Sequence, residues 1–549
     1  MWFLLLLCSV MAWGQTTTKP EELCRLDGVV KHAITGEPVR KASLTLQPMD
    51  SRGAAVPLTT ATNAEGKFSM KDVEPGQYRF SVDKPGFVRT SYGATALNRM
   101  GTTLTLAKGQ SMKDVEFRMQ PHAVITGRVL DEDGDPVQYA QLQLLSYRTM
   151  QGKRQLMPTG GAATNDLGEY RMFGIGPGKY YLGVIHRGSY MGFGGVDRSA
   201  AAAPDEGYPT TYYPGTMDVS GATQLSVGVG SMMQGVDVQM RKVRTFRVRG
   251  RVTGAPSGSR GGEVSATSKG IPEVAVYAMG RNSTMWRGPN GEFELRGLRP
   301  GSYVVSAMFW EGPQNQLAGQ ETVEIGERDV EGVTIRLGAG VEVSGSVKVE
   351  SDGEATGNMD AVNVALTPVQ PVMRPMMTSA KVQQDGGFRI ATVIPDQYMV
   401  RLYGMPAEYY LKSVRMGEVD VLENGITVTP SAVAGLEVVV SAKAAEVTGS
   451  VTNKDGKILP GAAVVLHPLS AKPQRLGDLQ KVLTSDQNGS FRFRGVAPGE
   501  YRLYAFEADP GEVSDADTLK EHEAKAVTLS LKEGAREMKE LKAVVLENR

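Results

Sequence analysis

Residues 63–80 read NAEGKFSMKDVEPGQYRF, and closely similar stretches begin at Asn165, Pro289, Gln384 and Gln487. In every copy an aromatic residue stands two positions after a glycine, and a tyrosine follows ten positions later. The aromatic residues are Phe68, Tyr170, Phe293, Phe388 and Phe491, and the tyrosines are Tyr78, Tyr180, Tyr303, Tyr398 and Tyr501. A spacing that is kept in five copies indicates one structural unit repeated along the chain.

Each copy also has a recognisable start and end. A glycine flanked by valine or a similar residue lies 38 to 41 residues before the turn glycine, at Gly28, Gly127, Gly250, Gly345 and Gly449. Each copy closes on an alternating stretch, such as Val115–Met119 or Val333–Leu337. Apolar residues at alternate positions predict a strand with one face on a core. Several such strands in about 100 residues are typical of an antiparallel β-sandwich.

The chain is therefore predicted to be all-β, with five tandem antiparallel, Greek-key β-sandwich domains. Their predicted boundaries are 26–120, 121–243, 244–338, 339–442 and 443–549, after an N-terminal tail at 15–25. The connections between the copies are short, which favours an extended, semi-rigid array of domains.

The repeated residues have a structural interpretation. The glycine before the aromatic residue supplies the positive φ of a hairpin turn, and the aromatic ring points into the core. The tyrosine after Pro-Gly is placed like a tyrosine corner, with its hydroxyl bonded to the backbone near the turn. The fourth copy has Pro395-Asp396 in place of Pro-Gly. Tyr78, Tyr180, Tyr303, Tyr398 and Tyr501 are thus predicted to be structural.

The N-terminus predicts export. An apolar run from Trp2 ends at Ala12-Trp13-Gly14, the small-x-small pattern that precedes a signal-peptidase cut, so 1–14 is a predicted signal peptide. An alternative is lipidation at Cys8, because Leu5-Leu6-Leu7-Cys8 resembles a lipobox. The mature chain then lacks a transmembrane segment and is periplasmic or extracellular.

The charge balance and the cysteine content limit which partners and which disulfides the chain can have. The 60 basic and 60 acidic residues balance, so nucleic acid is not an expected partner. After removal of the signal only Cys24 remains, and a single cysteine cannot form an internal disulfide. Cys24 is expected to be an inert thiol in the N-terminal tail, with an intermolecular disulfide as the alternative.

Together the motifs resemble a known family. Gly-x-Val, a turn such as Asp133-Gly134-Asp135-Pro136, an alanine at Ala140 or Ala462, Asn-x-x-Gly-x-Phe and Pro-Gly-x-Tyr resemble the carboxypeptidase regulatory-like domain. The resemblance covers nearly the whole mature chain and is strongest in copies one, two and five. It implies transthyretin-like sandwiches, related in shape to starch-binding-like sandwiches. It also implies the accessory domain of some zinc carboxypeptidases, not their catalytic domain, and tandem arrays of exported envelope proteins.

No catalytic residues, metal ligands or cofactor are predicted. The residues three positions after His32, His122, His186, His467 and His522 are Thr, Ile, Ser, Ser and Lys, so the His-x-x-Glu pair of a zinc peptidase does not occur. Neither a Gly-x-Ser-x-Gly elbow nor a phosphate-binding loop occurs in the sequence. Asp131, Asp133 and Asp135 invite a calcium interpretation, but Gly134 and Pro136 fit a turn better.

The second copy carries a tyrosine-rich insertion at 186–215. Tyr190, Tyr208, Tyr212 and Tyr213 are its candidate binding residues, since exposed aromatic rings on sandwich loops often hold sugars or proteins. The alternative is that these tyrosines pack on their own domain. The predicted function is a non-catalytic binding or scaffold protein of the bacterial cell envelope, whose partner is an envelope protein or a polysaccharide. A carbohydrate-binding protein is the first alternative, and an accessory part of a peptidase system is the second.

Overall fold

The structure is a computed structural model that describes residues 22–49, 56–95, 100–150, 153–186, 206–256, 261–268, 281–286, 291–310, 316–351, 359–369, 378–429, 431 and 433–546. These residues form an all-β protein, as predicted, in five successive pairs of sheets. We call each pair a unit, and within a unit we call the sheet that contains the opening strand the first sheet and the other the second sheet.

Unit 1 shows the arrangement that the others repeat. Its first sheet has the order β4 (Lys67–Val73), β1 (Cys24–His32), β8 (Ser111–Met119). Its second sheet has the order β3 (Leu58–Ala61), β2 (Ser43–Pro48), β5 (Gly76–Asp83), β6 (Thr90–Ser91), and β7 (Leu104–Leu106) also pairs with β5.

Units 2 and 3 follow. The first sheet of unit 2 contains β12 (Glu169–Ile175), β9 (Ala123–Leu130), β17 (Met232–Met233) and β18 (Val238–Gln239). Its second sheet contains β11 (Lys153–Ala163), β10 (Gln141–Met150), β13 (Gly178–Ile185), β15 (Thr211–Tyr212) and β16 (Leu225–Val227), and β14 (Glu206–Gly207) pairs separately with β19 (Val243–Arg244). The first sheet of unit 3 contains β23 (Glu292–Leu298), β20 (Phe246–Thr253) and β26 (Val330–Arg336), and the second contains β22 (Arg281–Trp286), β21 (Gly262–Ser268), β24 (Gly301–Trp310), β25 (Gln316–Ile325) and β27 (Gly338–Ala339).

Units 4 and 5 complete the chain. The first sheet of unit 4 contains β31 (Gly387–Val393), β28 (Val341–Glu350), β36 (Val433–Ser441), β33 (Tyr410–Met416) and β34 (Val419–Asp420), and the second contains β30 (Thr378–Lys381), β29 (Asn363–Pro368), β32 (Asp396–Tyr403) and β35 (Ile426–Val428). The first sheet of unit 5 contains β40 (Ser490–Val496), β37 (Ala445–Thr452) and β43 (Arg536–Lys542), and the second contains β39 (Lys481–Thr484), β38 (Ala463–Pro468), β41 (Gly499–Phe506) and β42 (Val527–Leu531). The described helices of unit 5 are α2 (Pro473–Leu479), α3 (Pro510–Val513) and α4 (Ala516–Glu521), and short 3₁₀ turns cover Val219–Gly221, Met359–Ala361 and Glu523–Lys525.

The sandwiches are not purely antiparallel. In every unit the opening strand pairs in parallel with a closing strand, as β1 does with β8 and β37 with β43. The remaining pairs are antiparallel. The reason is that the opening strand and a closing strand lie side by side in the first sheet and run in the same direction.

The turn before the aromatic residue also differs in part from expectation. Its glycine has a positive φ in all five units, such as 70° at Gly66 and 71° at Gly489, as predicted. The turn is not a hairpin, however, because β3 pairs with β2 in the second sheet while β4 pairs with β1 in the first. It carries the chain from one sheet to the other. The side chain of Asn63 holds the turn by accepting the backbone N–H of Glu65 and Lys67.

The opening glycine is explained by close approach of three elements. A Cβ added to Gly28 would lie 2.0 Å from the carbonyl oxygen of Val115 on the parallel strand and 2.7 Å from the ring of Phe68. A Cβ added to Gly127, Gly250, Gly345 or Gly449 would likewise lie between 1.8 and 2.1 Å from the corresponding carbonyl oxygen. The repeated aromatic residue therefore packs over a position that has no room for a side chain.

The repeated tyrosines have corner geometry. The hydroxyls of Tyr78, Tyr180, Tyr398 and Tyr501 each donate to the carbonyl oxygen four residues earlier, at 2.7–2.9 Å. Burial raises the pKa of Tyr303, and a backbone hydrogen bond with Arg299, again four residues earlier, opposes the rise. Asp396 does not disturb the corner of unit 4, whose Tyr398 makes the same bond at 2.8 Å. The hydroxyls thus fix the path of the chain into the strand that follows.

We expect Tyr501→Phe to lower the free energy of unfolding of the fifth unit by about 1–2 kcal/mol near neutral pH, because the half-buried carbonyl of Ala497 loses its donor. Burial raises the pKa of Tyr501 to about 12. The folded state therefore favours the neutral phenol, and this stability is lost as the pH rises from about 10 towards 12. The difference between the two proteins should shrink over that range. Urea titrations of residues 443–549 at pH 7 and at pH 11 measure it, and a Tyr501→Phe midpoint equal to the wild-type midpoint at pH 7 would contradict the corner.

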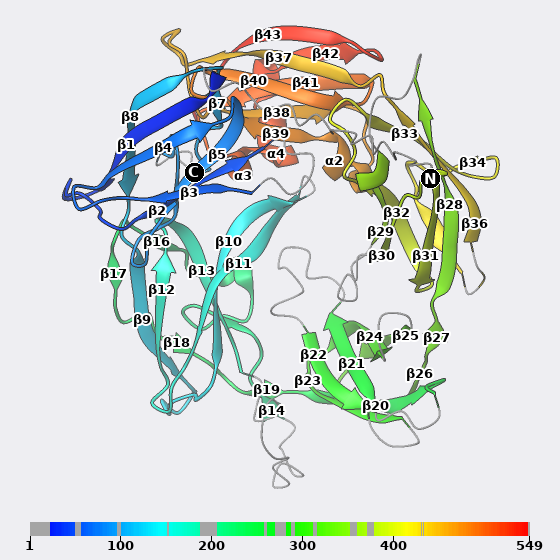
Figure 1. Ribbon diagram of the computed structural model, residues 1–549. Coiled ribbons are helices and arrows are strands. Elements are labelled where there is room, and N and C mark those ends of the chain that lie inside the picture. The colour runs from blue at the N-terminus through cyan, green and yellow to red at the C-terminus, as the bar shows by residue number, and fades with distance from the viewer. Residues whose placement is uncertain are drawn as a thin grey trace, which may run out of the picture.

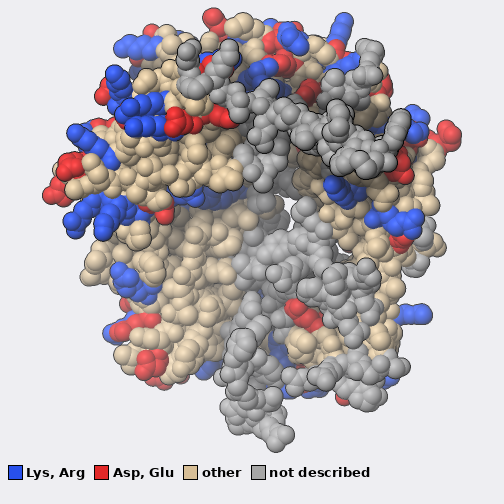
Figure 2. Space-filling model, in the orientation of Figure 1, with Lys and Arg blue, Asp and Glu red and all other residues tan. Residues whose placement is uncertain are grey.

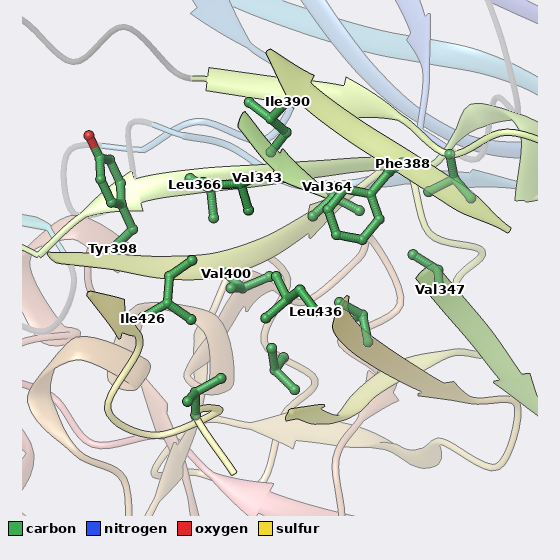
Figure 3. Packing of buried hydrophobic residues seen from close by; sticks show 14 of the residues in the cluster. Val343, Val347, Val364, Leu366, Phe388, Ile390, Tyr398, Val400, Ile426 and Leu436 are labelled. Carbon is green, nitrogen blue, oxygen red and sulfur yellow. The ribbon is translucent and has the colours of Figure 1, made fainter. Parts of the chain in front are cut away.

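Each unit has its own core between its two sheets. In unit 4, Val343, Phe388 and Ile390 of the first sheet face Leu366 and Val400 of the second (Figure 3). The corresponding clusters of the other units likewise contain residues of one unit only. Burial of these apolar side chains is the main stabilising contribution to each sandwich.

Cys24 belongs to one of these cores, so its predicted position in an N-terminal tail is wrong. It is the first residue of β1, 1% exposed, and its thiol donates to the carbonyl of Ala107 at 3.0 Å. Cys24 and Leu26 stand at alternate positions of β1, so both side chains point into the core. A buried Sγ cannot reach a second molecule, so the folded unit excludes the intermolecular disulfide.

The units do not form an extended array; Figure 1 shows them arranged in a ring. The first sheets lie on the outside of the ring and the second sheets lie toward its centre (Figure 1). Unit 5 closes the ring, because it contacts unit 1 through Gln487, unit 2 through Gly511 and unit 4 through Asp478. Short connections predicted a stiff chain, but they carry no information on contacts between side chains that are hundreds of residues apart.

Candidate binding site on the second unit

Of the four candidate tyrosines in the insertion, Tyr190 lies outside the described residues. The structure describes Tyr208, Tyr212 and Tyr213, and it places all three on unit 2. They do not form one surface, because Tyr208 and Tyr213 pack against the main core of the unit and Tyr212 lies in a separate cluster.

Tyr208 is half-buried where unit 2 leads into unit 3. Its hydroxyl donates to Oδ2 of Asp131 at 3.3 Å, and its ring contacts His186 edge-on with centroids 5.3 Å apart. The ammonium of Lys242 lies 5.4 Å from the same ring. Burial raises the pKa of Tyr208 and lowers the pKa of His186, so both are uncharged near neutral pH. Next to this group β14 pairs with β19, which ties the insertion to the connection between the units.

Tyr212 and Tyr213 pack on their own sandwich. Tyr212 is 6% exposed and lies with Leu145 and Leu156 in a small apolar cluster on the face of the second sheet opposite the main core. Burial raises its pKa to about 12. Tyr213 packs against the main core of the unit. The expectation that Tyr212 is an exposed contact residue is wrong, because β15 adds to the edge of β13 and places this ring over the sheet.

We expect Tyr212→Leu to lower the free energy of unfolding of unit 2 by about 1–3 kcal/mol, through the change of shape in a packed cluster, and to leave binding by the folded chain unchanged. Thermal unfolding and the pull-down described below measure the two effects. Loss of binding without loss of stability would instead restore Tyr212 as a contact residue.

The Asp131 stretch is a turn whose carboxylate is occupied by the chain itself. Oδ1 of Asp131 accepts the backbone N–H of Asp133 at 3.1 Å and that of Asp135 at 2.9 Å. Gly134 supplies a positive φ of 85°. Asn453 makes the same arrangement in unit 5, where the accepting side chain is an amide in place of a carboxylate. Both carboxylate oxygens of Asp131 thus serve the fold, one in the turn and one with Tyr208.

Another pair of tyrosines packs against the cluster that contains Tyr212, on the face of the second sheet opposite the main core. Tyr147 of β10 and Tyr181 of β13 are half-buried and meet edge-on with centroids 5.7 Å apart. The guanidinium of the exposed Arg154 on β11 lies 4.2 Å from the Tyr147 ring. Gln224 donates to the Tyr181 hydroxyl at 3.3 Å. We call Tyr147, Arg154, Tyr181 and Gln224 the aromatic platform.

Sequence reasoning missed the aromatic platform because it searched loops for aromatic residues. The available signal was Gln143, Leu145 and Tyr147, three large side chains at alternate positions on the face opposite the core residues Leu142 and Leu144. That alternation indicates a strand with bulky residues on both faces, which is unusual for a sheet that faces water on one side.

Unit 5 covers the corresponding face of its own second sheet with helices. Tyr504 and Phe506 of β41 pack there with Val513 of α3 and Leu519 of α4. His522 contacts the Phe506 ring, and His467 bonds through Nδ1 to Gln480, so these two histidines have structural neighbours. The second sheets of units 2 and 5 meet through this layer, since Thr149 of β10 donates to the carbonyl of Gly511 in α3 at 3.1 Å.

The outward faces of the first sheets carry ion pairs. Glu116 pairs with Lys31 and Arg118, and Glu294 pairs with Arg249 and Arg296. Figure 2 shows both signs of charge intermingled around the rim of this side of the molecule. Within the described part of the chain, no group of three or more His, Cys, Asp or Glu residues is arranged to hold a metal ion. None of the helices among the described residues has the length and apolar character that a membrane crossing requires.

Comparison with solved structures finds similar proteins. Three of the similar solved structures are the minor pilin GBS52 of Streptococcus agalactiae, two B repeat units of the collagen-binding protein CNA of Staphylococcus aureus, and a putative carbohydrate-binding protein of Bacteroides uniformis. Their identities to this chain are 13%, 10% and 11%, and their TM-scores are 0.23, 0.16 and 0.14. The matches cover 43%, 70% and 29% of this chain and 99%, 93% and 87% of theirs.

Searches by sequence give a narrower answer. A comparison with the curated proteins finds no match. The family model of the carboxypeptidase regulatory-like domain matches residues 25–120 and 446–534. These two segments fall on units 1 and 5, two of the three copies in which the motifs resemble that family most strongly. Units 1 and 5 are therefore the two parts of the chain whose sequences match the carboxypeptidase regulatory-like domain.

Proposed function

We propose that this chain is an exported, non-catalytic binding and scaffold protein of the bacterial cell envelope. The observation that carries the proposal is the use of the repeated polar residues by the fold itself. The corner tyrosines bond to backbone carbonyls, and Asn63, Asn165 and Asp486 bond to the amides of their own turns. The repeat therefore builds sandwiches, and binding is left to surfaces that individual units add.

The contacts of unit 5 support the scaffold part of the proposal. Unit 5 contacts units 1, 2 and 4, and these contacts bring the units together in the ring. A scaffold uses such an arrangement to present several surfaces to partners at once. The predicted signal at 1–14 supports export.

Carbohydrate binding at the aromatic platform is the second candidate function. Tyrosine rings present flat apolar faces with a polar edge, which suits the apolar face and hydroxyl groups of a sugar ring. Arg154 and Gln224 add hydrogen-bond donors beside the two rings. An accessory role in a peptidase system has no comparable observation in its support.

Binding is tested with the full chain as bait in an envelope extract and on polysaccharide affinity gels. Tyr147→Ala is the test variant, and Tyr403→Ala is the control, because Tyr403 is a 41% exposed strand tyrosine of unit 4. Carbohydrate binding at the aromatic platform is supported if a polysaccharide gel retards the wild type and Tyr403→Ala equally and retards Tyr147→Ala several-fold less. Capture of the same envelope protein by all three supports a scaffold that binds elsewhere. If the wild type captures nothing from either source, the proposed function is wrong.

A further inference from the structure

Unit 5 meets unit 1 through a side chain that imitates a β-strand. Oε1 of Gln487 accepts the backbone N–H of Thr105 at 3.0 Å, and Nε2 of the same side chain donates to the carbonyl oxygen of Thr105 at 2.6 Å. Next to it, Asp486 forms a parallel bridge with Thr103. Thr105 is the central residue of β7, which lies at an edge of the second sheet of unit 1. The primary amide thus supplies the donor and the acceptor that a neighbouring strand would supply.

The turn that carries Gln487 is built to hold this side chain in place. Oδ1 of Asp486 accepts the backbone N–H of Asn488 and of Ser490, both at 2.9 Å. Asp486 is itself buried, at 8% exposed. In unit 4 the same turn position is Gln384, which is exposed. Two units therefore carry the same residue at this position, and only one of them meets an edge strand there.

The seam that unit 5 forms with units 1 and 2 contains polar contacts. Among the described residues, its hydrogen bonds include the two to Thr105 and the one from Thr149 to Gly511. Every apolar cluster of the described residues belongs to a single unit, so none crosses this seam. We call these contacts the clasp. Polar contacts without a shared apolar core give weak, reversible association.

The seam between units 4 and 5 is different. Asp478 of α2 pairs with Arg401 of unit 4 at 3.0 Å, and Arg475 of α2 pairs with Glu423 of unit 4 at 3.6 Å. Glu533 of unit 5 accepts both the Tyr410 hydroxyl and the Lys412 ammonium. When the ring opens it should therefore open at the clasp, while unit 5 stays on unit 4.

We infer that the edge formed by Thr103 and Thr105 is a docking site for unit 5 of a second copy of this chain. Opening of the clasp leaves the backbone N–H and C=O of Thr105 without partners at a sheet edge, where such groups recruit another chain. The group with the matching donor, acceptor and rigid turn is Gln487, and another copy supplies it in the same geometry. The exchange replaces a contact within one chain by the identical contact between two chains, which is a low-cost route to a dimer.

The test uses two variants that damage opposite halves of the clasp. Gln487→Ala removes both hydrogen bonds from the unit 5 side. Thr105→Pro removes the N–H that points away from β5, a change that an edge strand tolerates. Gln384→Ala is the control, because it removes the same side chain from the same turn of unit 4. The molar mass of each full chain is measured by light scattering after size-exclusion chromatography over a wide range of concentration.

We expect the wild type and Gln384→Ala to shift towards twice the monomer mass as the concentration rises, and each clasp variant alone to stay monomeric. An equimolar mixture of Gln487→Ala and Thr105→Pro should regain the dimer, because one intact half from each chain completes a clasp. A monomeric wild type at every concentration would overturn the inference, and so would clasp variants that dimerise like the wild type. If Thr105→Pro melts at a lower temperature than the wild type, the comparison of Gln487→Ala with Gln384→Ala decides alone.

Discussion

Gly449→Ala is expected to lower the free energy of unfolding of the fifth unit by about 3 kcal/mol or more, a large share of the stability of an ordinary domain. A Cβ at this position would lie 1.8 Å from the carbonyl oxygen of Lys539 and 2.7 Å from the ring of Phe491. Both neighbours are fixed, the first as backbone of the paired strand β43 and the second as a core side chain that is 4% exposed. Relief requires the two strands to separate, which breaks the sheet at its centre.

Gly456→Ala is the matched control in the same unit. Gly456 has a φ of 77°, and a Cβ there would meet nothing within 4 Å. Its substitution is expected to cost only about 1–2 kcal/mol, the cost of placing an alanine in the left-handed backbone conformation. Denaturation of residues 443–549 with each change, followed by far-ultraviolet circular dichroism, compares the two. Equal midpoints would mean that the spacing of β37 and β43 is not what requires glycine.

The second large effect is expected at the seam between units 4 and 5. Asp478 lies between Arg401 and Arg475, whose side chains are only 15% and 4% exposed. Burial raises the pKa of Asp478, and the two guanidinium groups oppose the rise. Asp478→Ala leaves two buried cations with fewer partners, and loss of one member of a buried pair costs about 3–5 kcal/mol.

This cost should appear in the full chain and be much smaller in isolated residues 443–549, which lack Arg401. Glu533→Ala is the control, because Glu533 belongs to an ion pair whose side chains are about one-third exposed, 34% for Lys412 and 32% for Glu533. Its removal is expected to cost under about 1 kcal/mol. Thermal unfolding of the full chain and of the fragment measures both. A similar loss in the full chain and in the fragment would place the effect of Asp478 inside unit 5, away from the seam.

The sequence was sufficient to predict the sandwich because the fold imposes a local pattern. Alternating strands, the positive-φ glycine and the corner tyrosine are each set by contacts within about ten residues, and they recur with fixed spacing at Gly66 and Tyr78 and in the later copies. The parallel pairing of the opening and closing strands is not encoded by a local sequence pattern, so it was not predicted. The predicted domain boundaries remain predictions.

The arrangement of the units and the state of the insertion could not be predicted in the same way. Gln487 and Thr105 are separated by 382 residues, and the sequence around each of them contains no pattern that predicts their hydrogen bonds. The segment around Tyr212 has the amino-acid composition of an exposed binding loop. However, β15 pairs with β13 of the second sheet, and the ring of Tyr212 is buried there. Burial depends on the partner strand, which composition does not reveal. The aromatic platform was hidden for the opposite reason, since Tyr147 lies in a regular strand.

The ring closed by unit 5 is tested most directly by small-angle X-ray scattering of the full chain at low protein concentration. A compact chain of 549 residues has a radius of gyration of about 24 Å, and a ring of the same units should give about 25–30 Å. Five sandwiches in a row, each about 30 Å long from the rise of a nine-residue strand such as β1, would give about 40 Å or more. We expect the smaller value for the wild type and for Gln384→Ala, and an increase for Gln487→Ala. A wild-type value of about 40 Å, unchanged by Gln487→Ala, would contradict the closed ring.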